Sequence, residues 1–289
     1  MGLVDVGPLS LWVEDAGEGI PVLLIMGLGS QHLFWPDALV DVLVAAGHRV
    51  IRFDNRDVGW STKLDALGVP PIRAIARRRL VGLRTPVPYG LEEMADDAVG
   101  VLDALGVGRA HVVGASMGGM IAQLVALRHP DRVRSLTSVM SHTGELSHLL
   151  VHPKAARALL QPPPRTVEEA TRALLETFRA VGTQPFDEDA LRPLAERHAR
   201  RGFHPPGSAR QLAASITALP RTRALAALRV PTLVVHGDRD PLVPLRGGRA
   251  TARAIPGAAL SVYTGYGHDI PRVAWRRLAD DLRAHFQRT

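Results

Sequence analysis

The most informative stretch of this chain is Ala110-His111-Val112-Val113-Gly114-Ala115-Ser116-Met117-Gly118-Gly119, and apolar residues at helical spacing follow it from Met120 to Leu127. This order predicts a strand, a sharp turn and a helix. In the pattern G-x-S-x-G, Gly114 and Gly118 leave room for a tight turn around Ser116, which is typical of a serine held as a nucleophile. The serine hydroxyl would face the amides at the start of the helix, where negative charge is stabilised. The alternative is a glycine-rich turn whose serine only caps the helix, so the pattern needs partners elsewhere in the chain.

A serine hydroxyl is a weak nucleophile at neutral pH, so it needs a histidine as base and an acid that orients the histidine. In folds with this turn the three occur in the order Ser, Asp or Glu, His. Asp240 follows a strand predicted at residues 230–236, and His268 follows a strand predicted at residues 259–263. Because the carboxyl ends of parallel strands share one edge of a sheet, we expect Ser116, Asp240 and His268 to meet there.

Other acids and histidines have weaker claims to these roles. Asp238 competes with Asp240 for the role of the acid, although its side chain would also suit the organisation of the turn. Glu145 follows an earlier strand and is less well placed, while Asp54 and Arg56 would brace the loop that comes after them. Five further histidines lie within or beside predicted elements and are interpreted as structural: His48, His111, His129, His236 and His285.

Attack on a carbonyl also requires donors for the oxyanion that develops in the transition state. One donor is usually the amide of the residue after the nucleophile, here the N–H of Met117. The other comes from a loop after an earlier strand. An apolar run at residues 21–26 ends in Gly27-Leu28-Gly29-Ser30, and we expect the N–H of Leu28 to be the second donor. The alternative is an ordinary glycine-rich turn. Because backbone amides carry no sequence identity, the donor is assigned to within about one residue.

Five segments spread along the chain carry a resemblance to a known family. They are Met26-Gly27-Leu28-Gly29, Phe53-Asp54-Asn55-Arg56-Asp57-Val58-Gly59-Trp60-Ser61-Thr62, His111-Val112-Val113-Gly114-Ala115-Ser116-Met117-Gly118, Pro231-Thr232-Leu233-Val234-Val235-His236-Gly237-Asp238-Arg239-Asp240-Pro241 and Gly265-Tyr266-Gly267-His268. The chain resembles the serine α/β-hydrolases, and within them it is similar to the aclacinomycin methylesterase-like esterases and lactonases.

This resemblance implies a role for each matching residue. Ser116 would be the nucleophile, His268 the base and Asp240 the orienting acid, with the amides of Leu28 and Met117 as oxyanion donors. Many relatives have histidine at the position of Met26, but the methylesterase-like group shares this departure. The resemblance is weakest over residues 141 to 220, where substrate choice would be made.

The periodicity along the chain predicts an α/β fold. Strands predicted at residues 9–13, 21–26 and 50–53 alternate with helices predicted at residues 35–46 and 91–105, which favours a mostly parallel sheet covered on both faces. The α/β-hydrolase resemblance implies eight strands and a helical lid inserted after strand six. The expected division is a core at 1–140 and 221–289, with the lid at 141–220.

Within the expected lid no strand is evident. Helices are predicted at residues 155–160, 166–179, 187–201 and 208–218, and Thr166 with Glu169 forms a capping-box pattern at the start of the second. Four apolar residues of this region are candidates to line a substrate pocket: Leu149, Leu150, Leu175 and Phe178. The alternative is that these side chains pack the lid on itself.

Composition narrows the class of protein. A chain of 289 residues can bury a large core as one unit, and the lack of cysteine excludes disulfides and thiolate chemistry. The net charge of +7 comes from scattered arginines, and aromatic residues are 4% of the chain, so we expect no nucleic-acid partner. No apolar run is long enough to span a bilayer and no signal sequence is evident, which predicts a cytoplasmic protein without a membrane partner.

The leading hypothesis is therefore a serine hydrolase that cleaves a carboxylic ester or lactone through an acyl-enzyme. It would act on a small to medium apolar small-molecule substrate, with no metal and no organic cofactor. The same triad could instead serve a cofactor-free perhydrolase or haloperoxidase, a thioesterase or a C–C bond hydrolase. An aspartate nucleophile is disfavoured because serine occupies the turn, and a non-catalytic binding protein is disfavoured because all three triad members are present. The sequence leaves the oligomeric state open.

Overall fold

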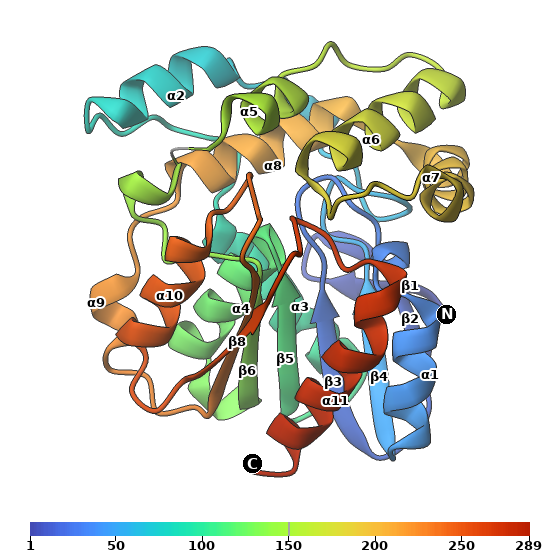
Figure 1. Ribbon diagram of the computed structural model, residues 1–289, viewed down its shortest axis with the longest axis vertical. Helices are drawn as coiled ribbons and strands as arrows, with labels where there is room; N and C mark the ends of the chain where they lie inside the picture. The colour runs from blue at the N-terminus through green and yellow to red at the C-terminus, as the bar shows by residue number, and fades with distance from the viewer. Residues whose placement is uncertain (150) are drawn as a thin grey trace.

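A computed structural model describes residues 1–149 and 151–289, and a single eight-stranded sheet forms its centre (Figure 1). The strands are β1 (Gly2–Val6), β2 (Leu9–Ala16), β3 (Ile20–Ile25), β4 (His48–Phe53), β5 (Ala110–Ala115), β6 (Val133–Val139), β7 (Thr232–Gly237) and β8 (Ala259–Tyr263). They lie in the order β1-β2-β4-β3-β5-β6-β7-β8. The pairs β1–β2 and β2–β4 are antiparallel, and the other five pairs of this order are parallel. The α/β prediction is confirmed.

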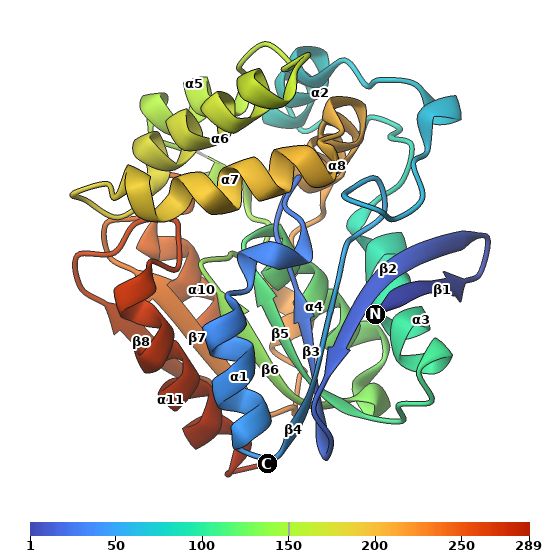
Figure 2. The same cartoon turned by 90° about the vertical axis from the view of Figure 1, so that its right-hand side faces the viewer.

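Helices lie on both faces of this sheet and above the carboxyl ends of its strands (Figure 1). They are α1 (Asp37–Ala45), α2 (Ile72–Leu80), α3 (Leu91–Ala104), α4 (Met117–Arg128), α5 (Pro153–Leu159), α6 (Val167–Val181), α7 (Glu188–Gly202), α8 (Pro205–Thr217), α9 (Thr222–Leu225), α10 (Leu245–Ala254) and α11 (Trp275–Phe286). Apolar residues of α1 and α11 form one buried core with the sheet, and those of α3 and α4 form the other. The two layers appear on opposite sides of the strands in Figure 2.

The central strands are apolar because helices cover them on both sides. Every residue of β5 and of β7 is buried, as expected of parallel strands between two helix layers. Their carboxyl ends lie side by side, since β6 pairs in parallel with both. The turn after β5 and the loop after β7 therefore open at one edge of the sheet, where a site can be assembled.

Several expected boundaries need correction. The strand expected first, at residues 9–13, is the second, because Gly2–Val6 precedes it and pairs with it through a turn in which Gly7 has a φ of 57°. The helix expected from residue 35 starts at Asp37, since Pro36 is its N-cap in extended conformation. The final helix, α11, begins at Trp275 after a short 3₁₀ turn at Arg272–Ala274.

The four helices α5 to α8, named here the helical insertion, lie between β6 and β7 in the sequence and above the carboxyl ends of the strands (Figures 1 and 2). In this part of the chain the described residues form helices and loops without a strand, as expected. One of the two hydrogen bonds of the predicted capping box forms, since Thr166 Oγ1 accepts from the N–H of Glu169. The Glu169 carboxylate accepts from the backbone N–H of Arg165 instead of that of Thr166. Leu150 and the side chain of Leu149, two expected pocket residues, lie outside what is described.

In the described ranges, we find no helix with the length and apolarity needed to cross a membrane.

Candidate active site

Ser116 lies in a strained turn between β5 and α4. Its φ of 55° and ψ of −120° fall in a region that side-chain-bearing residues rarely adopt and that costs of order 1–3 kcal/mol. The neighbouring glycines make the turn feasible. A Cβ on Gly114 would lie 2.0 Å from the carbonyl oxygen of Gly118, and one on Gly118 would lie 2.1 Å from that of Ile25. The turn therefore requires glycine on both sides, and it holds the Ser116 hydroxyl at the sheet edge.

The three side chains expected to meet do lie together. Ser116 Oγ is 2.9 Å from His268 Nε2, and His268 Nδ1 is 2.7 Å from Asp240 Oδ2. The second carboxylate oxygen, Asp240 Oδ1, accepts from the N–H groups of Leu242 and Val243 at 2.9 and 2.7 Å. Asp240 is buried and His268 is only 8% exposed. The carboxylate thus orients the ring so that Nε2 faces the serine hydroxyl.

The loop that carries His268 is attached to the end of α6. The N–H of His268 donates to the carbonyl of Val181 at 2.7 Å, and the N–H of Gly267 donates to Thr183 Oγ1 at 3.0 Å. Asp269 Oδ1 accepts from both the N–H and the hydroxyl of Thr183. Burial raises the pKa of Asp269 against the opposing effect of these hydrogen bonds. The sequence carried no signal for these contacts, because they join segments that are 84 to 87 positions apart.

The two backbone amides expected to act as oxyanion donors belong to residues that border the cavity. Among the described residues, neither the N–H of Leu28 nor that of Met117 has a hydrogen-bond acceptor. Both residues line the same cavity as Ser116. Unpaired amides beside a nucleophile have the donor character that an oxyanion requires. Leu28 and Met117 therefore stay the predicted oxyanion donors, and their N–H groups are free of other acceptors among the described residues.

The rival acids have other partners. Asp238 Oδ1 accepts from the N–H of Gly265, so it links the loops after β7 and β8. Glu145 accepts from the hydroxyl of Thr222 at 2.6 Å. Asp54 accepts from the N–H of Trp60, which fits the expected bracing of the next loop. None of these contacts involves the ring of His268.

Asp54 also belongs to a buried ionic cluster that the sequence did not indicate. His32 Nδ1 lies 2.9 Å from Asp54 Oδ1, and His32 Nε2 lies 3.1 Å from Glu14 Oε2. Burial opposes the charged imidazole, but the two carboxylates outweigh it and raise the pKa of His32. Arg52 pairs with Glu14, and Arg201 at the end of α7 pairs with Asp54. The side chain of Arg201 is only 7% exposed, although arginine side chains usually lie at the solvated surface.

A second buried ion pair joins α8 to the core. Arg210 donates to both oxygens of Asp57 at 2.7 and 2.8 Å, and both side chains are fully buried. Tyr89 donates its hydroxyl to the same carboxylate. Burial alone would raise the pKa of Asp57, but these donors and the N–H of Leu64 hold it below its ordinary value.

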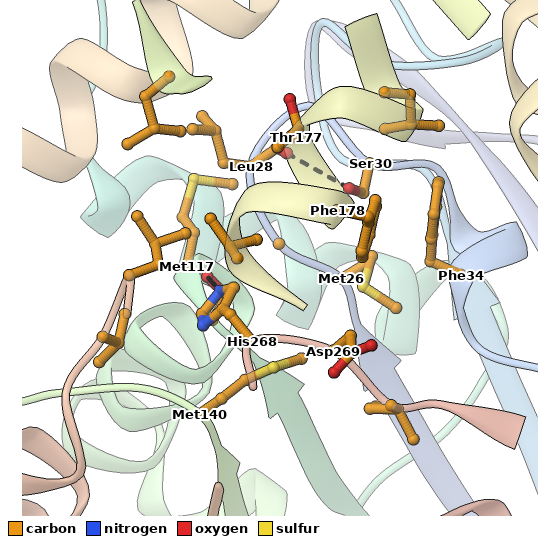
Figure 3. A pocket seen from close by; sticks show the side chains of 18 of the residues that line it. Met26, Leu28, Ser30, Phe34, Met117, Met140, Thr177, Phe178, His268 and Asp269 are labelled. Atoms are coloured by element: carbon orange, nitrogen blue, oxygen red, sulfur yellow. Dashed lines mark hydrogen bonds between the residues drawn. The ribbon is translucent and has the colours of Figure 1, made fainter. Parts of the chain in front are cut away.

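Ser116 and His268 border a mostly apolar cavity of about 1830 Å³, and Figure 3 shows part of its lining from close by. Met26, Met117 and Met140 lie around His268 on its floor, while Phe34 and Phe178 stand face to face on another wall. Phe178 therefore lines the cavity as expected. Leu175 is buried but does not border the cavity, so it packs within the protein instead. Over the described residues, no group of three His, Asp or Glu is arranged to hold a metal ion.

Comparison with known proteins places this geometry in a family. Residues 20–271 match the family model described as alpha/beta hydrolase fold. The chain is 33% identical to rhodomycin D methylesterase DnrP of Streptomyces peucetius, over 96% of this chain and 95% of that protein. It is 32% identical to 2-hydroxymuconate semialdehyde hydrolase of Pseudomonas sp. strain CF600, over 89% and 83% of the two chains.

Solved structures agree with the fold. A structure described as Est816, an N-acyl homoserine lactone degrading enzyme, matches with a TM-score of 0.73 and 25% identity over 98% of this chain and 99% of that one. A meta-cleavage product hydrolase from Pseudomonas fluorescens IP01 also has a TM-score of 0.73, but at 20% identity it supports the fold alone. The resemblance inferred from the sequence is confirmed, and the chain belongs to the alpha/beta hydrolase family.

Proposed function

We propose that this hydrolase cleaves carboxylic esters or lactones with Ser116 as nucleophile, His268 as base and Asp240 as orienting acid. The observation that carries the proposal is the continuous line from the Ser116 hydroxyl through His268 to Asp240, with spacings of 2.9 and 2.7 Å. This line opens into an apolar cavity. The same three roles occur on unrelated folds and are recognised by geometry.

In the proposed mechanism, His268 Nε2 accepts the proton of the Ser116 hydroxyl as the oxygen attacks the substrate carbonyl. The oxyanion is stabilised by the N–H groups of Leu28 and Met117. Asp240 stabilises the imidazolium without taking its proton. The imidazolium then protonates the leaving alcohol, and an acyl-enzyme on Ser116 remains. Water attacks the acyl-enzyme in the same way, with His268 again as base, and releases the acid.

The cavity and the relatives support an apolar substrate. A volume of about 1830 Å³ exceeds the roughly 300–1,000 Å³ of common ligand pockets, so it also has room for molecules larger than a simple ester. DnrP is named for hydrolysis of a methyl ester and Est816 for degradation of a lactone. We further propose that residues 141–220 form a lid that sets substrate choice over a core at 1–140 and 221–289.

A second candidate is hydrolysis of a C–C bond by the same residues. It is favoured by the 32% identity to 2-hydroxymuconate semialdehyde hydrolase. The two candidates differ in the bond that breaks. A panel of p-nitrophenyl esters, lactones and vinylogous 1,5-diketones, assayed side by side, would rank them by kcat/KM.

The proposal is tested by labelling and turnover. We expect a fluorophosphonate to label the protein at Ser116 and short p-nitrophenyl esters to be hydrolysed. Ser116→Ala should abolish labelling and lower turnover by roughly 10⁴- to 10⁶-fold. Ser147→Ala, at an exposed serine outside the cavity, is the matched control and should change neither. Undiminished turnover by a folded Ser116→Ala protein would refute the proposal.

A further inference from the structure

The loop after β3, which carries the candidate oxyanion amide of Leu28, is held by hydrogen bonds on several sides. Asn55 Nδ2 donates to the carbonyl of Met26 at 2.9 Å, and the N–H of Ser30 donates to the carbonyl of Gly27 at 3.2 Å. Ser30 Oγ donates to the carbonyl of Leu28 (dashed line in Figure 3). These bonds come from the core and from the loop itself.

One more bond comes from the helical insertion. The N–H of Gly29, the residue after Leu28, donates to Gln211 Oε1 at 2.8 Å. Gln211 lies on α8 and is fully buried. Its other end is engaged as well, because Gln211 Nε2 donates to the carbonyl of Arg56 at 2.7 Å. Turning the amide over would set donor against donor and acceptor against acceptor, so its orientation is fixed.

Close packing gives the loop little freedom to move away from this contact. Gly29 has a φ of 64°, and a Cβ there would lie 2.8 Å from Ser208 Oγ, also on α8. On the opposite side, a Cβ on Gly27 would lie 3.0 Å from that of Ser116. The loop is therefore enclosed between α8 and the nucleophile turn. The position of the Leu28 amide relative to the Ser116 hydroxyl is therefore set by contacts on both sides of the loop, those with α8 included.

We propose that Gln211 is a positioning residue for the oxyanion hole: it fixes the N–H of Gly29 so that the neighbouring N–H of Leu28 remains directed at the reacting carbonyl. This inference rests on the proposed function. It gives the insertion a role in the chemical step in addition to covering the cavity. Since Gln211 acts through the backbone, it touches neither substrate nor Ser116.

The test is Gln211→Met, which keeps the length of the side chain and removes both hydrogen bonds. Loss of one oxyanion donor costs about 10²- to 10³-fold in rate, and a displaced donor should cost less. We expect kcat on a p-nitrophenyl ester to fall by roughly 10- to 100-fold with KM changed less than about threefold. Affinity for a trifluoromethyl ketone, which forms a tetrahedral oxyanion on Ser116, should fall by the same factor as kcat/KM.

Ala213→Gly is the matched control for a purely structural effect. Ala213 is buried on the same helix and does not line the cavity, so this change should lower the melting temperature while kcat and inhibitor affinity remain. Gln211→Glu supplies the conservative variant. Only the protonated carboxyl can both accept from the N–H of Gly29 and donate to the backbone carbonyl of Arg56. The kcat of this variant, relative to that of the unaltered protein, should therefore rise as the pH falls from about 8 to about 5.5.

The outcomes separate the two proposals. If the unaltered protein cleaves esters and Gln211→Met retains full kcat and inhibitor affinity, the positioning role is wrong while the proposed function stands. Equal losses of kcat in Gln211→Met and Ala213→Gly would also overturn it, because helix destabilisation alone would then account for the effect. If Ser116 is not labelled and no ester is cleaved by the unaltered protein, the proposed function itself fails.

Discussion

The two halves of the helical insertion are attached to the core in different ways. The half formed by α7 and α8 is joined through buried charges, Arg201 with Asp54 and Arg210 with Asp57. The half formed by α5 and α6 has no buried ion pair to the core among its described residues. Fixed charges hold a helix in one position, since moving it would leave a buried ion unpaired. The α7–α8 half is therefore built to stay in place.

Among its described residues, the α5–α6 half meets the core through apolar packing and hydrogen bonds rather than through buried ion pairs. Phe178 of α6 stacks on Phe34, with ring centroids 5.6 Å apart and planes at 8°. At the end of α6, hydrogen bonds of the Val181 carbonyl and of Thr183 join the helix to the loop that carries His268. Such contacts can be exchanged at lower cost than an ion pair. We infer that α6 adapts the cavity wall, while α8 braces the oxyanion loop.

The largest expected effect comes from breaking the ionic attachment. Arg210→Met should lower the free energy of unfolding by about 3–5 kcal/mol, because the fully buried carboxylate of Asp57 would be left without its partner. Urea unfolding followed by circular dichroism measures this change. Arg192→Met is the matched control on α7. Its ion pair with Glu188 is exposed, so the loss should be within about 0.5 kcal/mol.

A double variant keeps this test informative if Arg210→Met does not fold. Adding Asp57→Asn removes the unpaired charge, so the protein should regain part of the lost stability. A loss of less than about 1 kcal/mol in Arg210→Met would show that α8 does not depend on the ion pair.

Lowering the pH should change the stability of the two halves in opposite directions. The pKa values of Asp54 and Asp57 are lowered, because burial is outweighed by their cationic and hydrogen-bonding partners. Their contribution to stability is thus present above the ordinary aspartate pKa of 3.8 and is lost as the pH falls below it. The raised pKa of Asp269 has the reverse effect, since its contribution is present below 3.8 and is lost as the pH rises.

We therefore expect α7 and α8 to lose amide-exchange protection before the end of α6 does when the pH falls from about 5 to about 3. Hydrogen exchange read by mass spectrometry, corrected for the intrinsic rate at each pH, checks this order. Asp57→Asn should weaken the pH dependence of α8. Simultaneous loss over both halves would contradict the comparison.

The same division separates what the sequence could predict from what it could not. The residues that meet at the sheet edge can be predicted from local sequence patterns. These are a glycine-serine turn, and an acid and a histidine that each follow a strand. Gly114 and Gly118 are required by contacts within the turn itself, so the pattern and its structural cause coincide. Such local rules also predicted most strands and the four helices of the insertion.

The attachments of the insertion follow no local rule. Arg210 and Asp57 are 153 positions apart, and Gln211 and Gly29 are 182 apart. An arginine on a predicted helix is expected at the surface, since burial of a charge is costly without a partner. Only the folded chain reveals that partner. The strand Gly2–Val6 escaped prediction for a related reason, because it is an edge strand whose pairing with β2 defines it.

A smaller effect is expected at the cavity wall. Phe178→Ala removes the stacking on Phe34 and part of the apolar wall, so KM for long-chain p-nitrophenyl esters should rise about tenfold. Hydrolysis of p-nitrophenyl acetate should change much less, because a two-carbon acyl group has little apolar surface to bury against this wall. Leu175→Val, one turn away and buried off the cavity, should cost about 1 kcal/mol of stability without altering either KM. Equal changes for both ester lengths would argue against α6 as the adaptable wall.

The smallest effect concerns the starts of α6 and α7, one helix from each half, which are capped in the same way. Thr166 caps α6 by accepting from the N–H of Glu169, and Asp187 caps α7 by accepting from the N–H of Ala190. Because a cap acts on the first turn alone, Thr166→Ala and Asp187→Ala should each cost about 1 kcal/mol in urea unfolding, and Thr166→Ser should cost less. If the two alanine variants lose equal free energy of unfolding, the halves differ in their attachments to the core and not in their helix starts. A loss several times larger for Asp187→Ala would instead mean that the α7 start contributes to holding that half in place.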